Sequence, residues 1–246
     1  MKSLRESILA DMDDVLKSGD EVIKDSILQW LKENLTKRSD YSDYKISEKP
    51  NKDGKYKVSF KEYVEFNRNA TSLTNGMFVW AATLYSNFSC SGCPKLTSLE
   101  GGPKKVKYGF SCSYCNSLTS LKGAPETVGG SFRCNDCDNL KSLEGAPKIV
   151  GIDFVCYNCD SLTSLVVAPK EVGRDFDCSH CSKLISLKGA PETVDKNFHC
   201  YYCDSLQTLE GAPKTVGGNF NCYNCGKQFT KDEVKSLCDA KKGIYV

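Results

Sequence analysis

The sequence lacks the features by which most enzymes, membrane proteins and proteins that coat nucleic acid are recognised. It has two histidines in 246 residues and no Gly-x-Ser-x-Gly, P-loop, dinucleotide-binding or His-Glu-x-x-His motif. Its net charge is +2, so it has no basic excess for neutralising phosphates. Its mean hydropathy is −0.40, and no apolar run is long enough to cross a membrane. We therefore expect a soluble, non-enzymatic protein without cofactors, with no membrane partner and without nucleic acid as its main partner.

The amino-terminal residues do not resemble a secretory signal, because Glu6 lies among the first seven residues and no apolar core segment follows. We therefore expect a reducing location such as the cytoplasm. Cysteine, by contrast, is abundant, with 15 residues. In a reducing location these cysteines are expected to be free thiols or metal ligands rather than disulfides.

A repeat of 22 residues dominates the chain. Each repeat carries Phe-x-Cys-x-x-Cys, then Leu-x-Ser/Thr-Leu, then in most copies Gly-Ala-Pro, and a valine lies four residues before the next phenylalanine. The seven Cys-x-x-Cys pairs run from Cys90 and Cys93 to Cys222 and Cys225. The phenylalanines that set the period, with no insertion between them, are Phe88, Phe110, Phe132, Phe154, Phe176, Phe198 and Phe220.

The repeat predicts a solenoid. Phenylalanine and the first cysteine are two residues apart, so in a strand both point to one side. One short strand and a Gly/Pro turn cannot bury that apolar side, so the coils must stack on one another. An imperfect first coil is expected near residue 60, with Phe66, Met77 and Leu84 at the phenylalanine, second-leucine and valine positions. This gives about eight coils over residues 60–226.

The pattern resembles leucine-rich repeats. Phe132, Cys134 and Cys137 fall at three consensus positions of L-x-x-L-x-L-x-x-N/C-x-L, whereas Leu140 falls one residue late. The Leu-Thr-Ser-Leu-x-Gly-Ala-Pro arc is similar to that of leucine-rich-repeat-like proteins of bacteriophages and gut bacteria. The resemblance covers residues 60–225 and implies a binding scaffold without indicating its ligand.

The two ends are predicted to be caps, which makes the fold class α/β. Residues 1–36 have helical spacing with an interruption at Ser18-Gly19-Asp20, and a hairpin is expected around Asp53-Gly54. Residues 1–59 thus form an amino-terminal region. Thr230 to Glu233 fit a capping box that opens a helix through Leu237, so residues 227–246 form a carboxy-terminal cap.

Two interpretations of the cysteines are open. Thiolate pairs chelate zinc, and adjacent coils could offer four sulfurs. Zinc would draw coils together in pairs, however, and the constant period shows no such alternation. Cys222, Cys225 and Cys238 also resemble the first three ligands of a zinc finger, but no fourth ligand follows. Because free cysteine packs as a small hydrophobe, we expect a buried ladder of thiols without metal or disulfides.

A binding face is expected on the outer side of the strands. Tyrosines on such a face provide rigid contact area with a polar tip, although tyrosine also simply suits strands. The residues predicted to bind a partner are Tyr157, His180, His199, Tyr201, Tyr202 and Tyr223. Other positions expected to face solvent are Tyr114, Asp136, Val155 and Asp177.

Three functions are compatible with these observations. The preferred one is a non-catalytic protein-interaction scaffold that binds a protein partner on the outer strand face. A second is a virion-associated protein, in the virion or the host cytoplasm, held by its amino-terminal helices; the first nine residues resemble the Met-Lys-x-x-x-Glu leaders of some phage proteins. The third is a zinc-dependent nucleic-acid-binding protein, against which the near-neutral charge argues.

Overall fold

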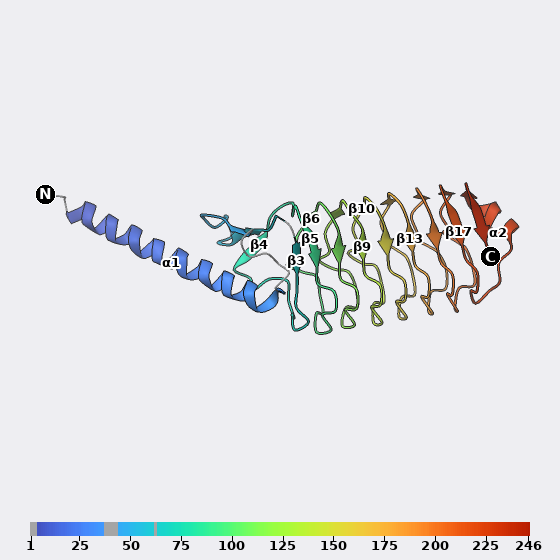
Figure 1. Ribbon diagram of the computed structural model, residues 1–246, viewed down its shortest axis with the longest axis horizontal. Coiled ribbons are helices and arrows are strands. Elements are labelled where there is room, and N and C mark those ends of the chain that lie inside the picture. The colour runs from blue at the N-terminus through green and yellow to red at the C-terminus, as the bar shows by residue number, and fades with distance from the viewer. Residues whose placement is uncertain (1–3, 37–43, 62) are drawn as a thin grey trace.

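The chain is a parallel β-solenoid of about nine stacked turns with 22-residue spacing. The computed structural model describes residues 4–36, 44–61 and 63–246, and for residues 4–18 it describes the backbone alone. One long helix, α1 (Leu4–Asn34), leaves the rod at one end, and a short one, α2 (Lys231–Leu237), lies at the other (Figure 1). The predicted α/β solenoid with helical ends is confirmed.

Each central coil contributes one strand to each of two parallel sheets. The 9-stranded sheet holds the phenylalanine strands, and its members are β3 (Tyr63–Glu65), β5 (Asn87–Ser89), β7 (Phe110–Ser111), β9 (Phe132–Arg133), β11 (Phe154–Val155), β13 (Phe176–Asp177), β15 (Phe198–His199), β17 (Asn219–Asn221) and β19 (Gly243–Tyr245). The 7-stranded sheet holds the valine strands, which are β6 (Lys105–Val106), β8 (Thr127–Val128), β10 (Ile149–Val150), β12 (Glu171–Val172), β14 (Thr193–Val194), β16 (Thr215–Val216) and β18 (Asp239–Ala240).

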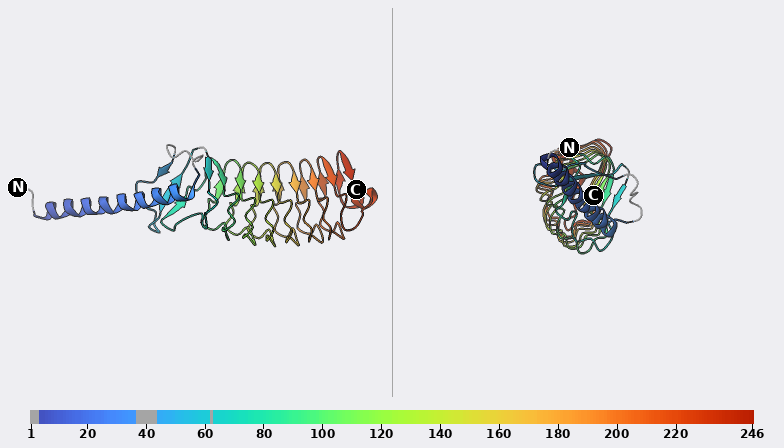
Figure 2. Two further views of the ribbon diagram at one scale, coloured as in Figure 1. Left: turned by 60° about the horizontal axis from the view of Figure 1, so that its bottom comes forward. Right: turned by 90° about the vertical axis from the view of Figure 1, so that its left-hand side faces the viewer.

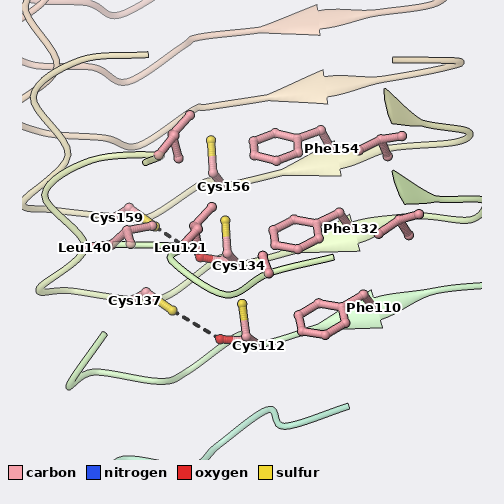
Figure 3. Packing of buried hydrophobic residues seen from close by; sticks show 14 of the residues in the cluster. Phe110, Cys112, Leu121, Phe132, Cys134, Cys137, Leu140, Phe154, Cys156 and Cys159 are labelled. Carbon is pink, nitrogen blue, oxygen red and sulfur yellow. Dashed lines mark hydrogen bonds between the residues drawn. The ribbon is translucent and has the colours of Figure 1, made fainter. Parts of the chain in front are cut away.

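Equivalent residues of successive coils stack on one another. Phe154 pairs with Phe132 on one side and Phe176 on the other, so the register follows the 22-residue period. Neighbouring phenylalanine rings from Phe88 to Phe220 lie 5.2–5.4 Å apart with interplanar angles of 4–24°. This spacing is close to the distance between hydrogen-bonded strands, which forces identical side chains into columns. Figure 3 shows the phenylalanine and cysteine columns side by side.

The cysteine ladder is buried, as predicted. All fifteen cysteines are free, and all but the half-buried Cys225 lie in the core. The second cysteine of a pair also donates its S–H to the carbonyl of the first cysteine one coil earlier. Examples are Cys137 to Cys112 at 3.3 Å and Cys159 to Cys134 at 3.2 Å (Figure 3). The thiol therefore satisfies a buried carbonyl while it packs as an apolar group.

The amino-terminal helix differs from the prediction. The helix α1 is continuous through Gly19, so the interruption expected at Ser18-Gly19-Asp20 is wrong. A single glycine costs a helix only about 1 kcal/mol relative to alanine, which is not enough to end it. The predicted hairpin is confirmed, because β1 (Lys45–Ile46) pairs antiparallel with β2 (Tyr56–Ser59). The strand β2 then pairs in parallel with β4 (Phe78–Trp80), which completes a 3-stranded sheet.

The first coil is out of register with the prediction. Val64, not Phe66, pairs with Phe88, so Phe66 lies two residues beyond the phenylalanine column. Its ring instead packs between Trp30 of α1, at 6.1 Å, and Phe88, at 5.5 Å. Where α1 packs on the solenoid, the first coil is thus shifted by two residues relative to the 22-residue period. Within the same coil, Leu73 is fully buried, whereas Met77 is only partly buried.

Leu84 occupies the valine position as expected, since it bridges to Val106. At the other end, the capping box of Thr230 and Glu233 is confirmed at the start of α2. Two strands after α2 were not predicted. In them Ala240 pairs with Val216 and Ile244 pairs with Phe220, which adds a coil to the expected eight.

One turn of the solenoid carries an unfavourable residue. In the Gly-Ala-Pro turns the glycine has a φ of +83° to +94°, whereas Val167 stands at the equivalent position with a φ of +65°. A β-branched residue in this left-handed region is strained. We expect Val167→Gly to raise the free energy of unfolding measured in urea by about 1 kcal/mol. This net value is the strain that is relieved minus the stability lost because glycine makes the unfolded chain more flexible.

The neighbouring Val166 is a matched control. It is also exposed, but it is not among the residues with positive φ. Val166→Gly should therefore lower stability, because it adds flexibility to the unfolded chain without relieving strain. A loss of stability in Val167→Gly would show that the turn is not strained.

Candidate binding site

Three columns of side chains lie on the outer side of the 9-stranded sheet. They lie one, three and four residues after each phenylalanine, beside the cysteines that point inward. In the first coils these columns are occupied mainly by serines, and Ser91, Ser111 and Ser113 hydrogen-bond to one another at 2.6 and 3.4 Å. In the last coils the same columns hold tyrosines and histidines.

The residue four positions after each phenylalanine has a left-handed backbone. The φ values are +51° to +68° in a column that contains Gly92 but also Tyr114, His180 and Tyr202. Bulky residues are uncommon in this conformation, and such strain often accompanies a functional surface. The ladder holds it in place, because His180 N–H donates to the Tyr201 carbonyl at 2.9 Å and Tyr202 N–H donates to the Tyr223 carbonyl at 3.1 Å.

Five of the six predicted binding residues are in contact. Tyr201 stacks on Tyr223 and His180 stacks on Tyr202, both with ring centroids 4.9 Å apart. The stacks meet edge to face, with Tyr201 to Tyr202 at 5.8 Å and Tyr202 to Tyr223 at 5.6 Å. His199 joins through Tyr201 at 5.9 Å. We call His180, His199, Tyr201, Tyr202 and Tyr223 the aromatic cluster.

Polar contacts fix the edge of the aromatic cluster. Asn221 Nδ2 donates to His199 Nδ1 at 2.7 Å. Burial, followed by the charges that Tyr201, Tyr202 and Asp177 would present, raises the pKa of Tyr223, so its hydroxyl stays protonated as a donor near neutral pH. The side chains of Tyr201 and Tyr223 are half-buried, while His180 and Tyr202 are exposed.

Tyr157 lies apart from the aromatic cluster. The next coil places Ser179 between Tyr157 and Tyr201 in their shared column. Ser179 is buried and donates its hydroxyl to Asp177 at 2.5 Å. Two coils separate the two tyrosines, which corresponds to about 10 Å. The 22-residue register shows this gap in the sequence as well, because Ser179 follows its phenylalanine by three residues just as Tyr157 and Tyr201 do.

The outward positions before the aromatic cluster are less exposed than expected. Val155 was predicted to face solvent, but it is 6% exposed. In its column it lies between Arg133 and Asp177 of the two neighbouring strands. Asp136 is half-buried and accepts hydrogen bonds from two asparagine amides at 2.6 Å. Tyr114 is exposed as predicted.

The thiols of Cys134, Cys156 and Cys159 are held in their neutral form. Burial raises the pKa of Cys134 and Cys156 well above the usual value, and it raises the pKa of Cys159 to about 12. Metal binding and nucleophilic catalysis both need the thiolate. Within the part of the chain that the structure describes, no three His, Cys, Asp or Glu side chains are grouped as a metal site requires.

None of the helices described in residues 4–36, 44–61 and 63–246 combines the length and the apolar character of a membrane span. Comparisons with protein-family models, with curated proteins and with solved structures find no match to this chain. The chain is thus described by its own architecture, a parallel β-solenoid of repeats with regularly spaced cysteines.

Proposed function

We propose that the chain is a non-catalytic, leucine-rich-repeat-like scaffold whose protein partner binds at the aromatic cluster. The observation that carries this proposal is the contact network of five aromatic side chains drawn from coils next to one another. Tyrosine is enriched at protein interfaces, where a few clustered aromatics provide most of the binding energy.

The orientation of the rings favours a protein as the ligand. Their faces are stacked on one another at 4.9 Å, so no second ring can enter between them. A ligand would meet ring edges, tyrosine hydroxyls and imidazole nitrogens along a strand face. Such an array suits a broad surface of mixed polarity. Bases of nucleic acids, by contrast, need free ring faces for stacking.

The state of the cysteines supports a reducing location. The buried thiols are all free. Proteins with many free thiols belong in compartments kept reduced, such as a bacterial cytoplasm or the cytoplasm of a phage's host.

The test is a double substitution in the aromatic cluster. Once a partner has been captured by crosslinking and identified, Tyr201→Ala/Tyr223→Ala should weaken its binding by about 100-fold or more, as expected when two interface anchors are lost. Calorimetry would give the dissociation constants. The thermal melting of the variant should remain close to that of the wild type, because both side chains lie outside the core.

Two controls accompany this test. Tyr85→Ala/Tyr108→Ala removes two exposed tyrosines elsewhere and should leave binding unchanged. Tyr157→Ala should also have little effect, because Tyr157 lies outside the aromatic cluster. Full-strength binding by the Tyr201/Tyr223 variant would contradict the proposal.

The second candidate is a virion-associated protein tethered by its amino-terminal helix. The observation that favours it is the extension of α1 away from the solenoid (Figure 2). If deletion of residues 1–36 abolished partner binding while the Tyr201/Tyr223 variant bound normally, α1 would be the interaction element and the solenoid a spacer.

A further inference from the structure

The helix α1 has two parts with different surroundings. Its carboxy-terminal turns are docked on the first coil, where Ile27 and Leu31 are fully buried. The Trp30 ring lies 5.5 Å from that of Phe78. The preceding turns extend beyond the solenoid in both views (Figures 1 and 2). The proposed binding at the aromatic cluster does not depend on this projecting part.

The projecting part carries an apolar stripe. A helix turns 100° per residue, which places its apolar positions within an arc of about 140°. The part of the stripe whose side chains are described is uncovered, since Val22 is 65% exposed and Ile23 is 38% exposed. The positions on the stripe are 4, 8, 9, 12, 15, 16, 22 and 23, occupied by Leu4, Ile8, Leu9, Met12, Val15, Leu16, Val22 and Ile23.

The spacing of the stripe is that of a helical bundle. Positions 9, 12, 16 and 23 of the stripe, with Gly19 between the last two, follow alternating steps of three and four residues, a period of 3.5. This period keeps one seam facing a partner helix along its whole length. A helix of about 20 residues is only marginally stable alone in water, so its stability must come from packing this stripe.

Charge argues against an anionic surface as the occupant. Residues 4–25 contain seven acidic and three basic side chains. Helices that lie on anionic lipid carry Lys and Arg on their polar face, and phosphate-binding helices need the same charges. The stripe therefore calls for another apolar helix of the same period, and a second copy of this chain supplies one.

The area of the seam indicates how many copies take part. Twenty residues of helix span about 30 Å, and a strip about 10 Å wide along that length covers roughly 300 Å². A stable interface usually buries about 800 Å² per partner, so one neighbouring helix is too little. A 140° stripe is also wider than the seam of a two-stranded coil. We propose that the projecting part of α1 assembles three or more copies of this chain into a helical bundle.

The test compares two pairs of substitutions in the full-length chain. Leu16→Glu/Ile23→Glu places two charges on the stripe, while Ala10→Glu/Lys17→Gln lowers the net charge by the same two units on the opposite side. Light scattering coupled to size exclusion should give at least three times 27.2 kDa for the wild type and the control pair. The stripe pair should run as a monomer of 27.2 kDa, with a smaller helical signal in circular dichroism and an unchanged melt of the solenoid.

Two outcomes would overturn the proposal. One is a wild-type chain that stays monomeric at every concentration tested. The other is an oligomer whose mass the stripe pair does not reduce, which would place the contact on the solenoid. Flotation of a monomeric wild type with anionic phosphatidylglycerol vesicles would likewise assign the stripe to a lipid surface and refute self-association.

Discussion

Replacing Phe154 by alanine is expected to lower the free energy of unfolding by about 3–5 kcal/mol. The side chain is fully buried, and its ring lies 5.4 Å from that of Phe132 and 5.3 Å from that of Phe176. Truncation leaves a cavity in the middle of the column, and neighbouring strands cannot close it because their own columns fix their spacing. Urea denaturation followed by circular dichroism measures the change.

Substitutions at an exposed residue and at buried positions provide the comparison for Phe154→Ala. Ile185→Ala, at a residue that is 57% exposed, should change stability by no more than about 0.5 kcal/mol. The loss of stability in Phe154→Leu should lie between those of Phe154→Ala and Ile185→Ala, because leucine retains most of the buried volume. Val155→Ser is not a neutral control, since Val155 is buried, and we expect it to cost about 1–2 kcal/mol. Equal effects for Phe154→Ala and Ile185→Ala would contradict the assignment of the core.

The central coils could be predicted from sequence because no insertion interrupts the period between Phe88 and Phe220. A single extra residue within a strand would reverse its inward and outward sides. The 22-residue period therefore translates directly into the register that pairs each phenylalanine with the next. Burial of the first cysteine followed from the same alternation, which places it on the side of the phenylalanine.

The ends could not be predicted in the same detail, because there tertiary packing overrides the repeat. Phe66 matches the period, but it packs against Trp30 of α1, a residue far away in sequence. The last coil contains no Phe-x-Cys. Its remaining signal is the four-residue spacing of Ala240 and Ile244, which mirrors that of Val216 and Phe220. That signal is recognisable once the strand pairing is known.

The candidate binding site was predictable in part. Strand alternation places His199 and Tyr201 on the outer side, and the shared 22-residue register stacks Tyr201 on Tyr223. The left-handed backbone at His180 and Tyr202 has no sequence signature, yet it brings these rings beside Tyr201. Whether the aromatic cluster binds a partner remains a prediction.

The buried thiols should make the fold sensitive to alkaline pH. Burial raises the pKa of Cys134, Cys156 and Cys178 well above the usual value, and the pKa of Cys203 rises to about 12. A group whose pKa is higher in the folded chain stabilises the fold fully below its unfolded pKa. That contribution is lost as the pH rises toward the folded pKa. The loss should therefore begin above about pH 8.5, the pKa of an unfolded cysteine.

The size of the loss follows from the number of thiols. Each buried thiol lowers the free energy of unfolding by about 1.4 kcal/mol for each pH unit above about 8.5. About ten such thiols together lower it by on the order of 14 kcal/mol per pH unit. Domains are usually stable by about 5–15 kcal/mol, so we expect cooperative unfolding near about pH 9.5 under anaerobic, reducing conditions. Circular dichroism would follow the transition, and urea midpoints measured from pH 7 to 9 would give its slope.

A variant with fewer buried thiols distinguishes this cause from general alkaline damage. Cys134→Val/Cys156→Val removes two of the protons that unfolding releases, so the slope of stability with pH should fall by about 2.7 kcal/mol per unit. Tyrosine does not contribute below about pH 10, the pKa of an unfolded tyrosine, and its ionisation can be followed separately by absorbance. Tyr56, whose pKa a hydrogen bond to Asp20 raises to about 12, adds a loss of stability only above about pH 10. A fold that stays intact at pH 10.5 with its thiols reduced would show that the cysteines ionise in place and that the ladder admits water.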